Sequence, residues 1–484
     1  MAVSNQSGER NCLMNVQNEL KQTMDYMEDK LRVSTNFDVI YRVLSIGKCR
    51  AVLYCIDGFT KDDMLEKLLE FLMEQMPEQL PADAHEFSKV LLPYAEIGLA
   101  KEYEPAVLAL LSGQSLLFID GYDQCLTIDC RTYPARSVSE PDKDKTLRGS
   151  RDGFVETLVF NTAMIRRRIR DPQLTMEVVQ AGRRSMTDIC FCYIEDRVDR
   201  ELLDKIRKKI TNLDVDALTM NQQSLAECIY PHKWYNPFPK FKFTERPDTA
   251  AASVLEGNLV VLVDNSPSAM VLPSSIFDII EEVDDYYFPP VTGSYLRLSR
   301  TLIAILTYFI TPVYLLLHLY PEWLPEWMEF ARIEEDIHVP ILVQLLILEL
   351  ALDGLRLAAV NTPSMLATPL SITAALVLGE FSVKSGWFNA ESVLYMAFVA
   401  MANFSQSSYE LGYAIKFMRI INLLLTAAFG LAGFIAGVVI FAAAVLTNRT
   451  ISGYSYLYPL IPFNWRKIKE RFFRVRIPYH INNQ

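Results

Sequence analysis

Short apolar segments alternate with helical patterns over the part of the chain that precedes position 293. Apolar runs of five or six residues rich in Val, Ile, Leu and Phe indicate buried strands, and longer stretches with a helical period indicate helices. In order, the pattern predicts a strand at 51–56, helices at 61–76 and 105–111, and strands at 115–120 and 124–129. A strand and helix alternation of this kind predicts a small α/β domain.

The same order of elements recurs later in the chain. It gives a strand at 189–194, helices at 199–210 and 249–255, and strands at 259–264 and 268–272. Ile56 matches Ile194, and Gly113 matches Gly257 at nearly the same offset along the chain. Two similar small α/β domains are therefore predicted, over residues 1–147 and 148–293. The alternative is two unrelated α/β domains that share only this coarse order.

The pattern changes after residue 293, where long apolar runs begin. These runs cover 302–319, 341–352, 366–378, 393–404 and 415–446. A span of the bilayer core needs about 20 apolar residues, so the last run is too long for one crossing and is expected to bend near Gly430 or to cross twice. The chain as a whole is thus predicted to be an α/β soluble part followed by an α-helical polytopic membrane domain at 294–464, with a basic tail at 465–484.

The distribution of positive charge predicts the orientation of the membrane domain. Arg297 and Arg300 precede the first run, the loop at 321–339 holds one Arg among six acidic residues, and the tail is rich in Lys and Arg. Because positive residues favour the cytoplasmic side, both ends of the domain are expected inside. This predicts an even number of crossings, four or six. The polar N-terminal segment shows no signal-peptide pattern, so both termini are expected in the cytosol.

Net charge and motifs exclude several function classes. Residues 1–293 carry a net charge of −13, which argues against a nucleic-acid partner. The turns after the strands, Asp57-Gly58 and Glu195-Asp196, lack the glycine pattern that holds a nucleotide phosphate and carry repelling carboxylates. No catalytic set, metal spacing or cofactor motif is present, so neither an enzyme nor a cofactor is predicted. All eight cysteines lie before residue 230 and are expected to be reduced and mostly buried.

A segment rich in Pro and aromatic residues, 231–248, connects the halves. Prolines exclude a regular helix there, and its five aromatic side chains favour a packed connector over a flexible one.

The second apolar run carries three charges on one helix face. Glu349, Asp353 and Arg356 stand at i, i+4 and i+7, and a charge within the bilayer costs about 2.5–3.5 kcal/mol on insertion scales. They are expected to form either a structural ion-pair cluster or a polar lining for ions. Arg356 is predicted to pair with Asp353, which leaves Glu349 to face water. Asn361 and Thr362, in the polar break that follows, complete the candidate ion pathway.

An arginine-rich stretch lies on the helical pattern that begins near Gly153. It contains Arg166, Arg167, Arg168 and Arg170, which cannot all share one buried stripe. Two interpretations remain open: a solvated helix face, or a contact surface for acidic subunits or anionic lipid headgroups.

Several long motifs in the chain are specific enough to compare with known families. The 148–174 stretch (RGSRDGFVETLVFNTAMIRRRIRDPQL) is similar to the hallmark of the receptor A subunits in the GerA-type family of spore germination proteins. Further similar segments are GRRS at 182–185, TERPD at 244–248, SPSAMVLP at 266–273 and DDYY at 284–287. In the membrane half, the segments 361–369, 388–398 and 459–464 resemble the stage V sporulation protein AF branch. Asn361 stands where the family usually has a His before Thr-Pro-Ser.

This resemblance implies a function that the periodicity does not. The family is expected to form an oligomeric ion channel in the spore inner membrane, with A-type subunits in a homo-oligomeric ring of five. The branch implies amplified release of monovalent cations during germination, with a small membrane protein as partner. A membrane transporter and a non-conducting scaffold for germination complexes are the alternatives.

Overall fold

The computed structural model describes residues 14–76, 80–92, 96–132, 146–230, 235–324, 326, 338–361, 372 and 375–474. The chain divides into two compact units. Unit 1 comprises residues 1–231 and 243–273, and unit 2 comprises residues 232–242 and 274–484.

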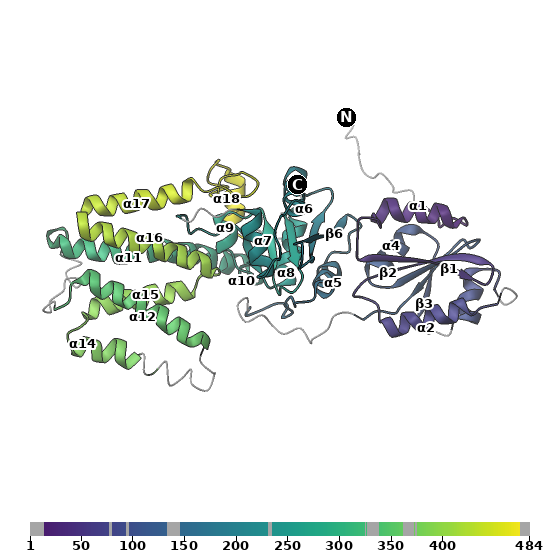
Figure 1. Ribbon diagram of the computed structural model, residues 1–484, viewed down its shortest axis with the longest axis horizontal. Coiled ribbons are helices and arrows are strands. Elements are labelled where there is room, and N and C mark those ends of the chain that lie inside the picture. The colour runs from purple at the N-terminus through teal and green to yellow at the C-terminus, as the bar shows by residue number, and fades with distance from the viewer. Residues whose placement is uncertain are drawn as a thin grey trace, which may run out of the picture. The chain divides into compact units, whose positions relative to one another are not determined.

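Unit 1 holds two five-stranded sheets of the same topology (Figure 1). The first sheet has the order β1-β2-β4-β5-β3 and the second has β6-β7-β9-β10-β8, so the strands correspond one to one. The first set comprises β1 (Val39–Ile46), β2 (Cys49–Ile56), β3 (Ile97–Ala100), β4 (Ser115–Ile119) and β5 (Cys125–Ile128). The second comprises β6 (Leu174–Ala181), β7 (Thr187–Ile194), β8 (Lys242–Thr244), β9 (Leu259–Val263) and β10 (Ala269–Leu272). The predicted duplication is confirmed at the level of strand order.

The sheets correct the predicted class of the two domains. Strand β2 pairs antiparallel with both β1 and β4, and β7 pairs antiparallel with both β6 and β9. Alternating strands and helices predicted α/β domains, whose sheets are mostly parallel. The first strand of each repeat was missing from that prediction, and this strand forms a hairpin with the next. In the first repeat the hairpin closes through Gly47 and Lys48, where glycine adopts the required positive φ of 59°.

Helices cover both faces of the first sheet. They are α1 (Leu20–Leu31), α2 (Asp62–Met73), α3 (Ala84–Glu86), the π-helix η2 (Phe87–Leu91) and α4 (Tyr103–Leu111). Val52 and Tyr54 pack with α1 and α4, whereas Leu53 packs with α2 on the other face. Because both faces are buried, β2 is apolar at nearly every position rather than at alternate ones.

The second sheet has its own helices: α5 (Leu158–Arg168), α6 (Arg200–Thr211), α7 (Asn221–Ile229) and α8 (Pro247–Leu255). Cys190 and Cys192 of β7 lie in the core formed with α5 and α8. Burial raises the pKa of the Cys190 thiol well above its usual range, and the neighbouring Cys192 adds to this. Five of the seven described cysteines are buried, as expected.

The two repeats meet through the segment just before β1. Asn36 Oδ1 accepts from the Met176 backbone N–H at 2.6 Å, and the Phe37 N–H donates to the Met176 carbonyl at 3.2 Å. These bonds engage the outward-facing backbone groups of Met176 in β6, the edge strand of the second sheet. Next to these bonds, Arg166 donates two hydrogen bonds to the Asp38 carboxylate, from Nε at 2.8 Å and from Nη2 at 2.9 Å. Both side chains are almost fully buried.

Unit 2 is helical. It contains α9 (Ile276–Ile280), α10 (Asp284–Tyr287), α11 (Pro290–Leu319), the 3-10 helix η3 (Pro321–Trp323), α12 (Ile341–Asn361), the π-helix η5 (Ala375–Phe381), α14 (Ser382–Lys384), α15 (Ala390–Phe404), α16 (Tyr409–Phe429), α17 (Leu431–Leu446) and α18 (Trp465–Phe472). By length and composition, α11 and α16 could cross a membrane, and α15 and α17 are shorter apolar helices. The predicted 366–378 run lies mostly outside the described residues.

The long apolar run at 415–446 forms a helical hairpin, as expected. Helix α16 ends at Phe429, and Gly430 turns the chain at φ 58° into α17. A Cβ on Gly437 would lie 2.3 Å from Asn422 Oδ1, so the absence of a side chain lets α17 approach α16 closely.

Contacts between helix ends define two ends of unit 2, here named the base and the top. At the base, the start of α11 lies beside α18, because Arg297 Nη1 donates to the Arg471 carbonyl at 3.1 Å. The start of α16 is also at the base, since Ser407 donates to the Ile279 carbonyl at 2.7 Å. At the top, Gly430 adjoins Tyr320, which follows α11. Helices α11 and α16 therefore run from base to top, and α17 returns to the base.

Helices α12 and α15 run in the opposite direction. The Tyr314 hydroxyl lies 3.2 Å from Ser392 Oγ, which places the start of α15 near the top end of α11. Gln344 Nε2 donates to Asn389 Oδ1 at 2.6 Å, which places the start of α12 there too. At the other end, Arg356 of α12 lies over the rings of Phe404 and Tyr409, close to the start of α16.

The aromatic connector is packed against unit 2, as predicted. Phe238 is fully buried and contacts the rings of Phe441 and Tyr456. Asn236 Nδ2 donates to the Ala444 carbonyl at 3.1 Å, which fixes the connector to the last turn of α17. Residues 231–234 lie outside the described part of the chain.

The buried pair between the repeats gives the first prediction. Asp38→Ala leaves the Arg166 guanidinium buried without its counterion, so the free energy of unfolding of unit 1 should fall by about 3–5 kcal/mol. Hydrogen exchange of α5 and β6 in the full-length protein should rise accordingly. Asp216→Ala, at the exposed pair with Arg184, is the matched control and should change stability by less than about 1 kcal/mol. Equal protection of α5 in the wild-type protein and Asp38→Ala would contradict this role.

Candidate functional site

Helix α12 carries two carboxylates that are paired with cations of α16. Glu349 is 3% exposed and Arg419 is fully buried. Arg419 Nε donates to Glu349 Oε1 at 2.9 Å, and Nη2 donates to the same oxygen. One turn away, Lys416 Nζ pairs with Asp353 Oδ2 and lies 3.6 Å from Glu349 Oε2. Two acidic residues of α12, four positions apart, thus pair with two basic residues of α16, three positions apart.

The same arginine also joins a third helix. Arg419 Nη1 donates at 3.0 Å to the carbonyl of Thr307 in α11. The three donor nitrogens of its guanidinium group are therefore all engaged, two by Glu349 and one by Thr307. Since unpaired charge is costly away from water, this network fixes α11, α12 and α16 together.

Neutral hydrogen bonds extend the network toward α17. Asn422 Nδ2 donates to the Tyr308 hydroxyl at 3.1 Å, and that hydroxyl donates to the Gly437 carbonyl at 3.0 Å. Thr426 donates to Asn422 Oδ1 at 3.2 Å. A charged cluster and a neutral cluster, together extending from Asp353 to Gly437, therefore lie within the apolar interior of four helices.

Exposure differs sharply within the charged cluster. Lys416 and Glu349 are nearly inaccessible, whereas the Asp353 side chain is 32% exposed in the single chain. Asp353 is thus the carboxylate of the network whose side chain is accessible at the surface of the single chain.

These contacts correct two sequence predictions. Asp353 pairs with Lys416, not with Arg356, and Glu349 is sealed against Arg419 rather than facing water. The guanidinium of Arg356 instead lies 5.2–5.7 Å from the ring centres of Phe404, Tyr409 and Tyr413. Lys416 and Arg419 belong to a helix far beyond the acids in the chain, so local spacing could not supply them as partners.

The other candidates of the ion pathway lie at the end of α12. Asn361 is the last residue of this helix, and its side chain is not among the described ones. Thr362 lies outside the described residues.

The four arginines near α5 have different environments. Arg166 is buried against Asp38, so it is neither a subunit contact nor a lipid contact. Arg168 is half-buried and pairs with Asp152. Arg167 and Arg170 are exposed, and only they retain the predicted accessibility.

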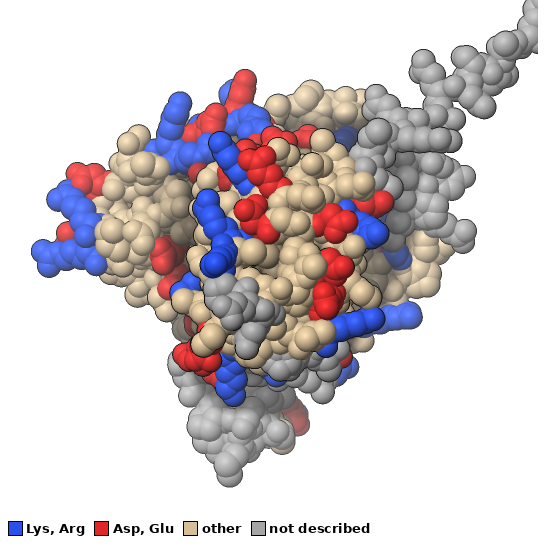
Figure 2. All heavy atoms as spheres, turned by 90° about the vertical axis from the view of Figure 1, so that its right-hand side faces the viewer, with Lys and Arg blue, Asp and Glu red and all other residues tan. Residues whose placement is uncertain are grey.

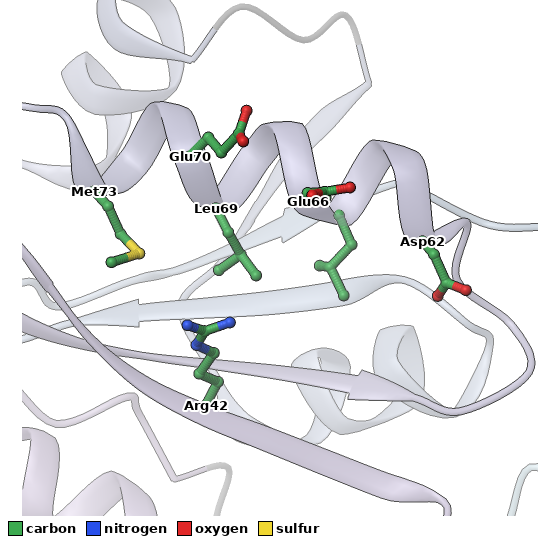
Figure 3. A pocket seen from close by; sticks show the side chains of 7 residues that line it. Arg42, Asp62, Glu66, Leu69, Glu70 and Met73 are labelled. Atoms are coloured by element: carbon green, nitrogen blue, oxygen red, sulfur yellow. The ribbon is translucent and has the colours of Figure 1, made fainter.

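A shallow groove of about 370 Å³ lies in unit 1, between α2 and β1. Figure 3 shows Arg42 pointing from the strand toward the helix, with Leu69 and Met73 on the near side of α2 and Glu70 pointing away. The seven lining residues contain no combination of nucleophile, base and orienting group. Among the described residues, no group of three or more His, Cys, Asp or Glu could hold a metal ion.

Figure 2 shows the charged side chains on one face of the protein. Lys and Arg side chains there are interspersed with Asp and Glu among uncharged residues, without a contiguous basic patch among the described atoms.

A repeated α+β unit and a helical unit with a buried charge network together define a two-part protein with apolar helices. A family model described as Bacillus/Clostridium GerA spore germination protein matches residues 25–484. The chain belongs to this family of spore germination proteins.

Individual relatives agree with this assignment. Stage V sporulation protein AF of Bacillus subtilis (strain 168) is 34% identical over 455 residues, which cover 94% of this chain and 92% of that protein. Spore germination protein KA of the same organism is 28% identical over 458 residues, or 93% of this chain and 83% of the relative. The predicted resemblance to the family and to the AF branch is confirmed.

Two further matches are a membrane protein and a solved structure. The uncharacterized membrane protein YfkQ of Bacillus subtilis (strain 168) is 28% identical over 447 residues, covering 91% of this chain and 86% of that protein. The crystal structure of the N-terminal domain of the A subunit of the Bacillus megaterium spore germinant receptor GerK3 is 24% identical. It covers 54% of this chain and 97% of that domain, with a TM-score of 0.41.

The geometry of the network predicts which carboxylate is structural. Glu349→Gln leaves Arg419 buried without a counterion and should destabilise unit 2 by about 3–5 kcal/mol, seen as a lower unfolding temperature of the detergent-solubilised protein. The charge-swapped double variant, Glu349→Arg with Arg419→Glu, should recover part of this loss. Glu380→Gln, at the exposed pair with Lys384, is the control and should have little effect. If Glu349→Gln unfolds at the wild-type temperature, the Glu349–Arg419 pair does not stabilise unit 2.

Proposed function

We propose that this protein is a non-enzymatic subunit of a homo-oligomeric ion channel in the spore inner membrane, where it amplifies the release of monovalent cations during germination. The observation that carries the proposal is the buried charge network that joins the largely apolar helices α12 and α16. Family membership supports the role in germination, and the relative YfkQ, which is described as a membrane protein, supports a location in the membrane.

Asp353 is the group assigned to the conducting path. It is the accessible carboxylate of the network, and in the proposed ring of five subunits it would recur once per subunit. A ring of carboxylates attracts cations. Lys416, buried beside it, limits the negative charge that each subunit presents.

The directions of the helices support a chain that crosses the bilayer an even number of times. Helix α11 runs from base to top, α12 from top to base, and α15 again from top to base. The end of α12 is therefore at the base and the start of α15 at the top; after α15, α16 ascends and α17 descends. Six passes place the start of α11 and the tail on one side, which by its Lys and Arg content is the cytosolic side.

Ion flux tests the channel assignment. Full-length protein in liposomes should pass K⁺ passively down its gradient, and should elute from detergent columns as a discrete ring. Asp353→Asn should lower the K⁺ flux, because it removes the accessible charge while Lys416 keeps Glu349 as a partner. Lys416→Gln should act in the opposite direction and raise cation preference. Saturable exchange by a monomer would favour a transporter, and a ring without flux would favour a scaffold.

Thiol labelling tests the topology. Glu322 is exposed at the top and Lys467 is exposed at the base, so cysteines placed there should lie on opposite sides of the membrane. Glu322→Cys should react with a membrane-impermeant thiol reagent in intact cells, and Lys467→Cys only after permeabilisation. The protein without either substitution measures the background from its native cysteines. Labelling of both sites in intact cells would exclude six passes.

A further inference from the structure

The segment at 460–473 combines exposed apolar and basic side chains. Leu460, Ile461, Phe463 and Trp465 are 39%, 46%, 70% and 58% exposed and follow one another along the chain. Large apolar side chains grouped in this way on a described surface indicate a binding partner or a membrane.

Basic residues continue directly from this apolar run. Helix α18 carries Arg466, Lys467 and Lys469 on its exposed side, with Ile468 buried against unit 2. Its sequence includes one acid, Glu470. Lys469 Nζ lies 5.2 Å from the centre of the Trp465 ring, and Phe463 stacks on that ring at 6.3 Å. Aromatic and basic groups are thus adjacent, as in helices that lie in a membrane interface.

The base of α11 fixes the position of this surface. The Arg474 N–H donates to Ser294 Oγ at 2.9 Å, and the Phe472 and Phe277 rings lie 5.5 Å apart. Arg471 pairs with Asp278 and Glu281, so α18 is held firmly. The apolar part of α11 begins near Leu302, eight residues beyond Ser294, which corresponds to about 12 Å along a helix. That distance places α18 at the level of lipid headgroups.

We propose that α18 and the preceding residues 460–464 form a binding site for anionic phospholipids. Lys467 and Lys469 bind the headgroup phosphates, while Phe463 and Trp465 enter the boundary with the acyl chains. Basic residues near an anionic surface attract it electrostatically, which favours anionic over zwitterionic lipid. This inference rests on the proposed function, because that function places α11 in a bilayer.

Quenching of Trp465 fluorescence by brominated lipids tests this site. The purified full-length protein in mixed micelles is titrated with brominated phosphatidylglycerol or brominated phosphatidylcholine, and the signal of Trp465→Phe is subtracted to remove the other tryptophans. Phosphatidylglycerol should reach half-maximal quenching at a mole fraction about tenfold or more below that of phosphatidylcholine. The Lys467→Gln, Lys469→Gln double variant should lose this preference. Lys21→Gln with Lys67→Gln, two exposed lysines of unit 1, is the matched control and should keep it.

Two further experiments are needed. One distinguishes the apolar contribution to lipid binding from the charged one, and the other distinguishes a lipid phosphate from free phosphate. Phe463→Ala should weaken quenching by both lipids to a similar extent, because it removes apolar contact without changing charge. Excess inorganic phosphate should leave the quenching unchanged, and displacement of the lipid by phosphate would reassign the site to a free anion. Equal quenching by the two lipids in the wild-type protein would overturn the proposal.

The measurement is independent of conduction. If the protein prefers phosphatidylglycerol but passes no ions, the channel proposal is rejected and the lipid-site proposal is kept. If the protein passes K⁺ but shows no preference for phosphatidylglycerol, the lipid-site proposal is rejected and the channel proposal is kept.

Discussion

Unit 2 depends on the neutralisation of one arginine. Arg419 is fully buried among apolar helices, where a guanidinium cannot lose its charge and cannot reach water. Two groups compensate this charge: the Glu349 carboxylate of α12 on one side and the Thr307 backbone carbonyl of α11 on the other. Because both partners must be present together, the pair sets the register of three helices at once. Apolar contacts alone would allow these helices to slide along one another.

The network has a rigid part and an accessible part. Glu349 and Arg419 are closed to solvent, while Asp353 is accessible at the surface of the single chain and shares Lys416 with the buried acid. A single lysine between two carboxylates can tolerate the loss of one of them. This arrangement allows the structural and the electrostatic tasks to be carried by different residues of the same helix face.

Much of the fold could be predicted from local sequence. The apolar strands and their helices in unit 1 were located because burial on both faces leaves a continuous apolar run, as in β2 and β7. The strands β1 and β6 were missed because they lie at sheet edges, where half-exposed positions break the pattern. The class also differed, because β2 and β7 each pair antiparallel with both of their neighbours, and local sequence does not show these pairings.

The candidate site was only half predictable, for a related reason. A single helix shows which of its charges share a face, and it thus identified Glu349 and Asp353. The partner of each depends on which distant helix packs there, and Lys416 and Arg419 emerge only from the tertiary structure. Arg356, the local candidate, finds aromatic rings instead. In the same way, the Arg166 partner, Asp38, lies far away in the other repeat.

The hydrogen bonds that Asn36 and Phe37 form with Met176 of β6 have a consequence for synthesis. Residues of the first repeat leave the ribosome before the second repeat is complete, and domains generally fold as units in that order. The first repeat can therefore close its own sheet early and present these two residues as a finished template. The second sheet then forms with the outer backbone groups of Met176 in its edge strand already engaged, which limits pairing of that strand with another nascent chain. An unprotected edge is a known site of aggregation, so the order of the two repeats along the chain is itself a safeguard during translation.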